Sequence, residues 1–120
     1  MKEEVKNWIE QSKKDLDTAK YNFNGKKYEF AAFLCQQSVE KALKALSIKK
    51  TGEFKKIHDL ILLGKGINLP ENLLNYCKEI TPAYTYSRYP DVVPIKDLKN
   101  TAKKLIEYSG EILKWVRSQL

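Results

Sequence analysis

The side chains best suited to chemistry lie on one face of a single predicted helix. Between Tyr28 and Ile48, a helical step of about 100° per residue gathers amides and charges within an arc of roughly 140°. These residues are Gln36, Gln37, Glu40, Lys41 and Lys44. The carboxylate accepts hydrogen bonds, the amides donate and accept them, and the lysines supply positive charge for a phosphate. Because Glu40 and Lys44 are four residues apart, a solvated face with an ordinary ion pair is the alternative interpretation.

Two later segments add to this candidate site. His58, the sole histidine of the sequence, starts a short predicted helix, where it is either an acid–base group or a packed polar residue. The segment with Tyr84, Tyr86, Arg88 and Tyr89 suits base stacking and phosphate binding, or else packing that closes the fold. For a bound nucleotide we expect phosphates to meet Lys41, Lys44 and Arg88, a base to stack on Tyr86 or Tyr89, and Lys13 to lie outside the site. The full predicted nucleotide-binding set is Gln37, Glu40, Lys41, Lys44, His58, Tyr86, Arg88 and Tyr89.

Several other chemistries are disfavoured by the residues present. One histidine and two distant cysteines do not make a zinc site of known spacing, so we expect no metal. Neither a P-loop nor a nucleophile elbow occurs. The carboxylates are scattered over helix faces that the pattern predicts to be solvated, and none is predicted to be buried as a tuned acid would be. We therefore expect no cofactor and no catalytic residue.

The elements that position these residues are predicted to be helices throughout. The expected helices span residues 2–23, 28–48, 58–63, 71–80 and 95–119, and residues 81–94 form a long irregular loop. The second helix is apolar on nearly all sides at its start, which is typical of a central helix, and Val39 and Leu43 lie on its buried stripe. Gly64 and Gly66 end the third helix. The predicted fold is one all-α domain, residues 1–120, an antiparallel up-and-down bundle of four to five helices.

Net charge, apolar runs and cysteine usage limit the possible partners and the expected location of the protein. The 120 residues carry a net charge of +7 with a pI near 9.3, which favours an anionic partner such as a nucleotide, RNA or an acidic protein. No apolar run approaches a membrane span, and residues 1–10 lack a signal peptide's apolar segment. We expect a cytoplasmic protein in which Cys35 and Cys77 are reduced thiols.

Apolar residues left over after one bundle is filled predict a homodimer. The last helix carries a second apolar line beside its buried stripe, and the second helix has phenylalanines that point away from the core. The candidate dimer contacts are Phe30, Phe33, Tyr108 and Trp115.

Several short segments, taken together, resemble the HEPN family, the higher-eukaryote and prokaryote nucleotide-binding domain. The resemblance covers nearly the whole chain. It rests on Trp8, on Asp15-Leu16 with Ala19, on residues 37–45 (QSVEKALKA), on His58-Asp59-Leu60 with Leu63, and on residues 87–91 (SRYPD).

This resemblance implies a helical bundle, usually a homodimer, and many family members are encoded beside a minimal nucleotidyltransferase. Other members are metal-independent RNases in which four to six residues separate an arginine from a histidine. Here the permitted positions after Arg88 hold Val93, Pro94 and Ile95, so the RNase motif is absent. We therefore predict a non-catalytic module that binds a nucleotide, partners a nucleotidyltransferase in a toxin–antitoxin-like pair, or does both. The alternatives are an RNase toxin with an atypical site at His58 and Arg88, and a purely structural dimeric interaction protein.

Overall fold

The computed structural model describes residues 1–86 and 96–120, apart from the side chain of Tyr86. Throughout these residues the regular secondary structure is helical, which confirms the all-α prediction. The elements are α1 Glu3–Asn24, α2 Tyr28–Thr51, α3 Leu60–Gly66, α4 Glu71–Ile80, α5 Ala83–Tyr86 and α6 Leu98–Ser118. Since α5 is a single turn of 4 residues, the described part of the chain contains five helices of more than one turn.

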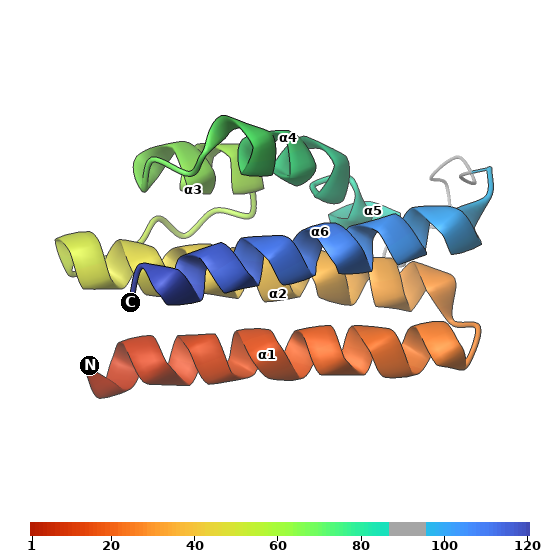
Figure 1. Cartoon of the computed structure of the whole chain (residues 1–120), viewed down its shortest axis with the longest axis horizontal. Helices are drawn as coiled ribbons and strands as arrows, with labels where there is room; N and C mark the ends of the chain where they lie inside the picture. Colours follow the sequence, from red (N-terminus) through yellow and green to blue (C-terminus); the bar gives the residue numbers. More distant parts are fainter. Residues whose placement is uncertain (87–95) are drawn as a thin grey trace.

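The helices run alternately up and down the long axis of the molecule. Residues 25–27 are all that join α1 to α2, so the two helices lie antiparallel, as such a short connection requires. The chain then returns through α3, α4 and α5, and α6 runs back antiparallel to α1 (Figure 1). The N- and C-termini consequently lie at the same end of the bundle (Figure 1).

Helix α2 is the centre of the fold, because it contacts each of the other helices. The predicted contacts of this helix with the first and last helices are confirmed. Val39 and Leu43 are fully buried, as their places on the apolar stripe predict. Small buried residues on α2, among them Ala31, Cys35, Ser38 and Ala42, leave room for several neighbouring helices, and Ser38 contacts Ser12 of α1.

These two buried serines bind each other's helix reciprocally. Ser12 Oγ donates to the backbone carbonyl of Ser38 at 2.6 Å, and Ser38 Oγ donates to that of Ser12 at 2.7 Å. Each hydroxyl is thereby satisfied without water, which removes the cost of burying it. The α1–α2 contact thus has a fixed register as well as an apolar interface.

The structure corrects the predicted ends of three segments. Helix α3 continues through Gly64 and ends at Gly66; a side chain at Gly64 would lie 3.0 Å from Leu69 Cδ2, so this glycine permits close packing inside the helix. The stretch predicted to be irregular contains α5, whose Ala83 is fully buried. Helix α6 begins at Leu98 because Asp97, at a φ of 55°, is in the left-handed region and interrupts helical geometry.

Truncating Leu43 tests the central role of α2. Leu43→Ala should lower the free energy of unfolding by about 2–5 kcal/mol, because a fully buried leucine loses both its transfer energy and its packing. Leu62→Ala is a matched control, since Leu62 is 52% exposed and an exposed substitution changes stability by roughly 0.5 kcal/mol or less. Urea unfolding of both variants gives the comparison; equal midpoints would contradict the assignment of α2 as the core.

Candidate functional site

The polar face of α2 is not solvated, which corrects the interpretation of Glu40 and Lys44 as an exposed ion pair. Both side chains are only 7% exposed, and their ion pair spans 3.0 Å between Lys44 Nζ and Glu40 Oε2. Glu40 is therefore a buried carboxylate, although the pattern predicted none. Side chains of α1 and of the segment after α2 cover this face, as the contacts below show.

The Glu40 carboxylate accepts hydrogen bonds from three side chains. Gln36 Nε2 donates to its Oε1 at 3.0 Å, and His58 Nδ1 lies 2.9 Å from the same oxygen. Lys44 Nζ donates to Oε2 at 3.0 Å. Because a buried charge is tolerated only when it is paired and hydrogen-bonded, this network is what allows Glu40 to lie inside the protein. Gln36, fully buried, is a central member that was grouped with this face but left out of the predicted binding set.

Burial and hydrogen bonding act on the Glu40 carboxyl in opposite directions. Burial alone raises its pKa, because the charged form is poorly solvated. The hydrogen bonds from Gln36, His58 and Lys44, together with the charge of Lys44, outweigh burial and hold the pKa below the ordinary value of 4.5. Glu40 is thus an ionised anchor at neutral pH and has no proton to donate there.

The Lys44 ammonium is enclosed by rings from two other segments. Its Nζ lies 5.3 Å from the ring centre of Phe54 and 6.0 Å from that of Trp8. The two rings meet edge to face, with their centres 5.0 Å apart. Cation–π attraction of this kind adds to the ion pair, so α1, α2 and the segment after α2 meet around one lysine.

His58 is the member of the network that reaches the surface. Its side chain is 55% exposed, whereas its carboxylate partner is buried. An ionised carboxylate only accepts hydrogen bonds, so Nδ1 must carry the proton donated to Glu40, and Nε2 is the acceptor of the neutral ring. The ring also stacks on Tyr84 of α5, with centres 4.6 Å apart and planes 23° apart. The imidazole is consequently held in one orientation.

Asp59 fixes the backbone beside this histidine. Its Oδ1 accepts hydrogen bonds from the backbone N–H groups of Ile61 and Leu62 at 2.9 and 3.2 Å. Asp59 is therefore the N-cap of α3, which begins at Leu60 and not at residue 58 as predicted. Asp59 thus starts α3, and His58 binds the beginning of this helix to Glu40 of α2.

Lys41 lies beside the network but is paired elsewhere. Its Nζ binds Asp15 Oδ2 of α1, and the Lys41 side chain is 22% exposed. Gln37 Nε2 donates to Gln36 Oε1 at 2.7 Å, and the Gln37 side chain is half-buried. The structure therefore brings Gln37, Glu40, Lys44 and His58 together, and it gives each predicted phosphate lysine a carboxylate partner. The sequence analysis did not anticipate Asp15 as the partner of Lys41. The burial of Asp15 could have been predicted, because Asp15 lies on the α1 face that carries Leu16 and Ala19.

Three predicted site residues cannot be placed in this geometry. Arg88 and Tyr89 lie outside the described residues, and so does the side chain of Tyr86. Their proposed contacts with a nucleotide stay predictions.

Thiol chemistry and metal binding find no support in the described residues. Cys35 and Cys77 are free and buried, and burial raises the pKa of each thiol to about 12. Neither forms appreciable thiolate at neutral pH, which a nucleophile would require. Within residues 1–86 and 96–120, no cluster of three or more histidine, cysteine or acidic side chains is arranged to hold a metal ion. In the same ranges, no helix combines the length and apolar character needed to cross a membrane.

The predicted dimer contacts fall into two separate groups. Phe30 is 44% exposed and stacks against the partly buried Phe33, with ring centres 6.1 Å apart. Tyr108 stacks on Tyr76 of α4 at 4.1 Å, and Trp115 packs partly buried against the core. Leu98 lines the same hollow as Phe30, and Trp115 lies about 25 Å further along α6 at 1.5 Å per residue. The four residues do not form one continuous patch.

Replacing Glu40 tests the network through the pH dependence of stability. A lowered folded-state pKa means that the stabilisation from Glu40 is complete above pH 4.5 and is lost as the pH falls through the folded-state value. Glu40→Gln should remove this acid-sensitive contribution and cost about 3–5 kcal/mol at pH 7, because it leaves Lys44 buried without a counter-charge.

The double variant Glu40→Gln/Lys44→Met is the matched control, since it removes both charges and should recover part of the loss. Urea unfolding between pH 3 and pH 8 measures both effects. A Glu40→Gln variant whose stability keeps the full pH dependence of the parent below pH 4.5 would show that the network does not hold the carboxylate ionised.

Comparison with known proteins agrees with this architecture. The HEPN domain family matches residues 5–119. A crystal structure of a Thermus thermophilus protein superposes with a TM-score of 0.89 at 26% identity, covering 99% of this chain and 100% of the other. The crystal structure of an archaeal HEPN homologue gives 0.80 at 36% identity, with 99% and 98% covered.

An HEPN domain protein from Thermotoga maritima shares the fold, with a TM-score of 0.77 at 22% identity and with 94% and 96% of the two chains covered. Among functionally curated proteins, none shows a significant sequence match. The family match spans nearly the whole sequence and the archaeal homologue shares more than a third of its residues, so this chain belongs to the HEPN domain family.

Proposed function

We propose that this chain is a non-catalytic HEPN module that binds a nucleotide, and that it acts alone or beside a minimal nucleotidyltransferase. The observation that carries the proposal is the contrast between the buried charges on α2 and the exposed histidine that contacts them. Glu40 and Lys44 form an ion pair with each other inside the fold, whereas His58 is held in one orientation at the surface. An oriented polar ring whose described carboxylate partner is ionised and fully hydrogen-bonded suits recognition better than bond cleavage.

His58 and Gln37 supply the recognition groups in this proposal. The Nε2 atom of the neutral imidazole is an acceptor, and the Gln37 amide offers both a donor and an acceptor, which is the chemistry that reads the edge of a base. Arg88 follows Tyr86, the last residue of α5, by two positions in the sequence, and α5 carries the Tyr84 ring that stacks on His58. Arg88 and the partly exposed Lys41 provide charge for the phosphates.

The homodimer and the nucleotidyltransferase partner belong to the same proposal. Of the two groups of apolar contacts, Phe30 and Phe33 are favoured for a symmetric interface, because Phe30 presents a stacked phenylalanine pair to solvent. The stack of Tyr108 on Tyr76 is already used within one subunit. The net charge of +7 supports an anionic ligand or partner.

Calorimetric titration with ATP and GTP tests nucleotide binding. His58→Ala should weaken binding about two- to tenfold, because one hydrogen bond contributes roughly 0.5–1.5 kcal/mol. Arg88→Ala should weaken it in a salt-dependent way, since it removes a charge contact. Lys78→Ala is the control, as this exposed lysine of α4 lies outside the network. Equal small losses from Arg88→Ala and Lys78→Ala, with none from His58→Ala, would indicate diffuse charge attraction and no site.

An RNase with an atypical site is the second candidate, and one observation favours it. A buried carboxylate that orients an exposed imidazole is the arrangement by which enzymes position a general base. The absent family histidine after Arg88 speaks against it, because cleavage also needs a second proton-transfer group and a charge stabiliser.

We expect purified protein to leave single-stranded and structured RNA intact in the presence of a chelator. RNA products would be resolved by gel electrophoresis over hours at micromolar protein. Cleavage that disappears in both His58→Ala and Arg88→Ala would replace the binding proposal with the RNase candidate. Cleavage that persists in both variants would identify a contaminant.

A further inference from the structure

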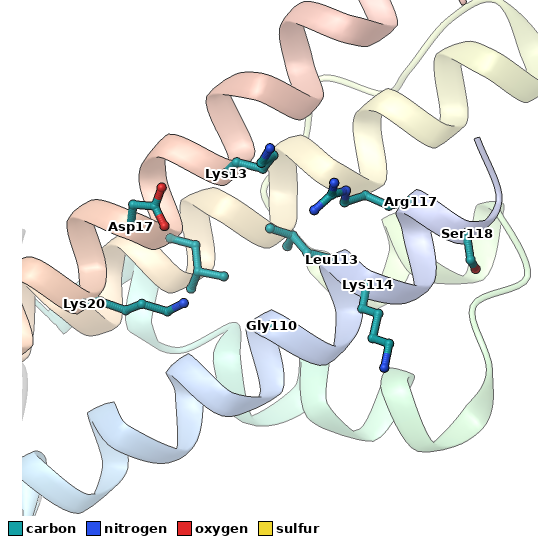
Figure 2. Close-up of a pocket in the computed structure, with 9 residues that line it drawn as sticks. Lys13, Asp17, Lys20, Gly110, Leu113, Lys114, Arg117 and Ser118 are labelled. Carbon is teal, nitrogen blue, oxygen red and sulfur yellow. The ribbon is translucent and has the colours of Figure 1, made fainter.

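A second surface, remote from the motif residues, has the chemistry of an anion site. Helices α1 and α6 enclose a groove of about 620 Å³. Figure 2 shows it running between the two helices, with Leu113 pointing into the space between them, and Leu16 also lines it. Its rims carry Lys13, Asp17, Lys20, Gly110, Lys114, Arg117 and Ser118.

The rims of this α1–α6 groove are strongly basic. Four cations and one carboxylate line it, and in the described part of the chain none of the four cations forms an ion pair. Lys41 and Lys44, by contrast, are both paired with carboxylates. The groove therefore carries four cations that have no ion-pair partner among the described residues, whereas both lysines of the motif face are paired.

Three of the cations are placed along the groove on its inner side. Lys13 of α1 and Arg117 of α6 extend toward each other across one end, while Lys114 points away from α1 (Figure 2). Lys20 lies about 10 Å further along α1, since seven residues at 1.5 Å each separate it from Lys13. Positive charge at two points along an open groove suits an extended chain of anionic groups.

Gly110 supplies an independent reason to regard the groove as a binding surface. It lies in the interior of α6, where glycine is roughly 1 kcal/mol less favourable than alanine. A Cβ atom at this position would meet no described atom within 4 Å, so packing in the described part of the chain does not require the glycine. The missing side chain instead leaves space within the groove, on the face that Lys20 and Leu113 also line.

The lining residues select the class of ligand. Leu16 and Leu113 are 7% and 5% exposed, so these two leucines offer a partner helix little surface to bury. None of the described residues that line the groove is aromatic, so they offer no platform for base stacking. The remaining chemistry is that of phosphate oxygens, which lysine attracts as a point charge and arginine binds through a fork.

We propose that the α1–α6 groove binds the phosphodiester backbone of a single-stranded nucleic acid, independently of base sequence. This inference goes beyond the nucleotide-binding proposal, because it concerns a different surface and a polymeric ligand. On α1, helical spacing places Lys13, Asp17 and Lys20 on the side opposite Asp15, which faces Lys41. A strand in the groove and a nucleotide at His58 therefore do not compete for the same residues.

Fluorescence anisotropy with a labelled 12-nucleotide RNA of mixed sequence tests the proposal across a range of salt. Binding should weaken linearly on a log–log plot, and a variant that lacks one phosphate-binding cation should show a slope about 0.7 shallower. Lys13→Ala and Arg117→Ala should each lower affinity and reduce the slope. Lys78→Ala on α4 removes the same charge outside the groove and should leave the slope unchanged.

Filling the groove with a larger side chain tests the contribution of its shape to RNA binding without changing its charge. Gly110→Leu leaves the net charge unchanged and improves helix propensity, and its Cβ has no close neighbour within 4 Å in the described residues, so the variant should fold with about the parent's stability. It should lower RNA affinity by tenfold or more if the strand occupies the groove. Gly110→Ala should stabilise the protein and reduce RNA affinity much less.

The same variants decide against the proposal in definite ways. Equal slopes in the Lys13, Arg117 and Lys78 variants, or full RNA binding by Gly110→Leu, would show that the groove holds no strand. A Gly110→Leu variant that alters the oligomeric state without affecting RNA binding would make the groove a contact between copies of this chain. Loss of RNA binding in His58→Ala with intact binding in the groove variants would leave nucleotide recognition standing and overturn the groove.

Discussion

The burial of one carboxylate governs how this fold is assembled. Glu40 is on the central helix, and an isolated charge there would cost several kcal/mol. Its three hydrogen-bond donors come from two segments, since Gln36 and Lys44 are on α2 and His58 precedes α3. The third hydrogen bond to the carboxylate therefore requires the chain after α2 to return to α2 so that His58 reaches Glu40. Asp59 starts α3 immediately after that point, and Tyr84 of α5 stacks on the imidazole. The polar network and the covering layer of α3 to α5 are consequently linked through His58 in the folded state.

The helices were predictable from the sequence because their information is local. Apolar periodicity placed Val39 and Leu43 on a buried stripe, and both are fully buried. The exposure of the opposite face was not predictable in the same way. A helical wheel shows which residues share a side, but not whether another segment covers that side. Covering α2 depends on α5, a single turn inside a stretch rich in proline, and one turn has too few residues to show a period.

The candidate site shows the same limit at the level of single residues. Spacing alone grouped Gln37, Glu40 and Lys44, and the structure brings them together with His58. Their roles depended on partners that are distant in sequence, because Asp15 pairs with Lys41 from another helix. The groove was less predictable still. Lys13 was expected to lie outside the nucleotide site, and nothing in the sequence marked it as part of another. Only the neighbouring position of α6 makes Lys13 and Arg117 two sides of one surface.

The distribution of charge follows from the network. A carboxylate that is buried must be paired, so Lys44 is held in a buried ion pair with Glu40, and Lys41, which stays partly exposed, is paired with Asp15. The net charge of +7 must then act mainly from elsewhere on the surface. On α1, one side carries Asp15, which binds the centre of the fold, and the opposite side carries Lys13 and Lys20. The same helix thus pairs Lys41 with its carboxylate on one face and presents its lysines to anions on the other. Because the two roles occupy opposite faces, a substitution can change one without the other.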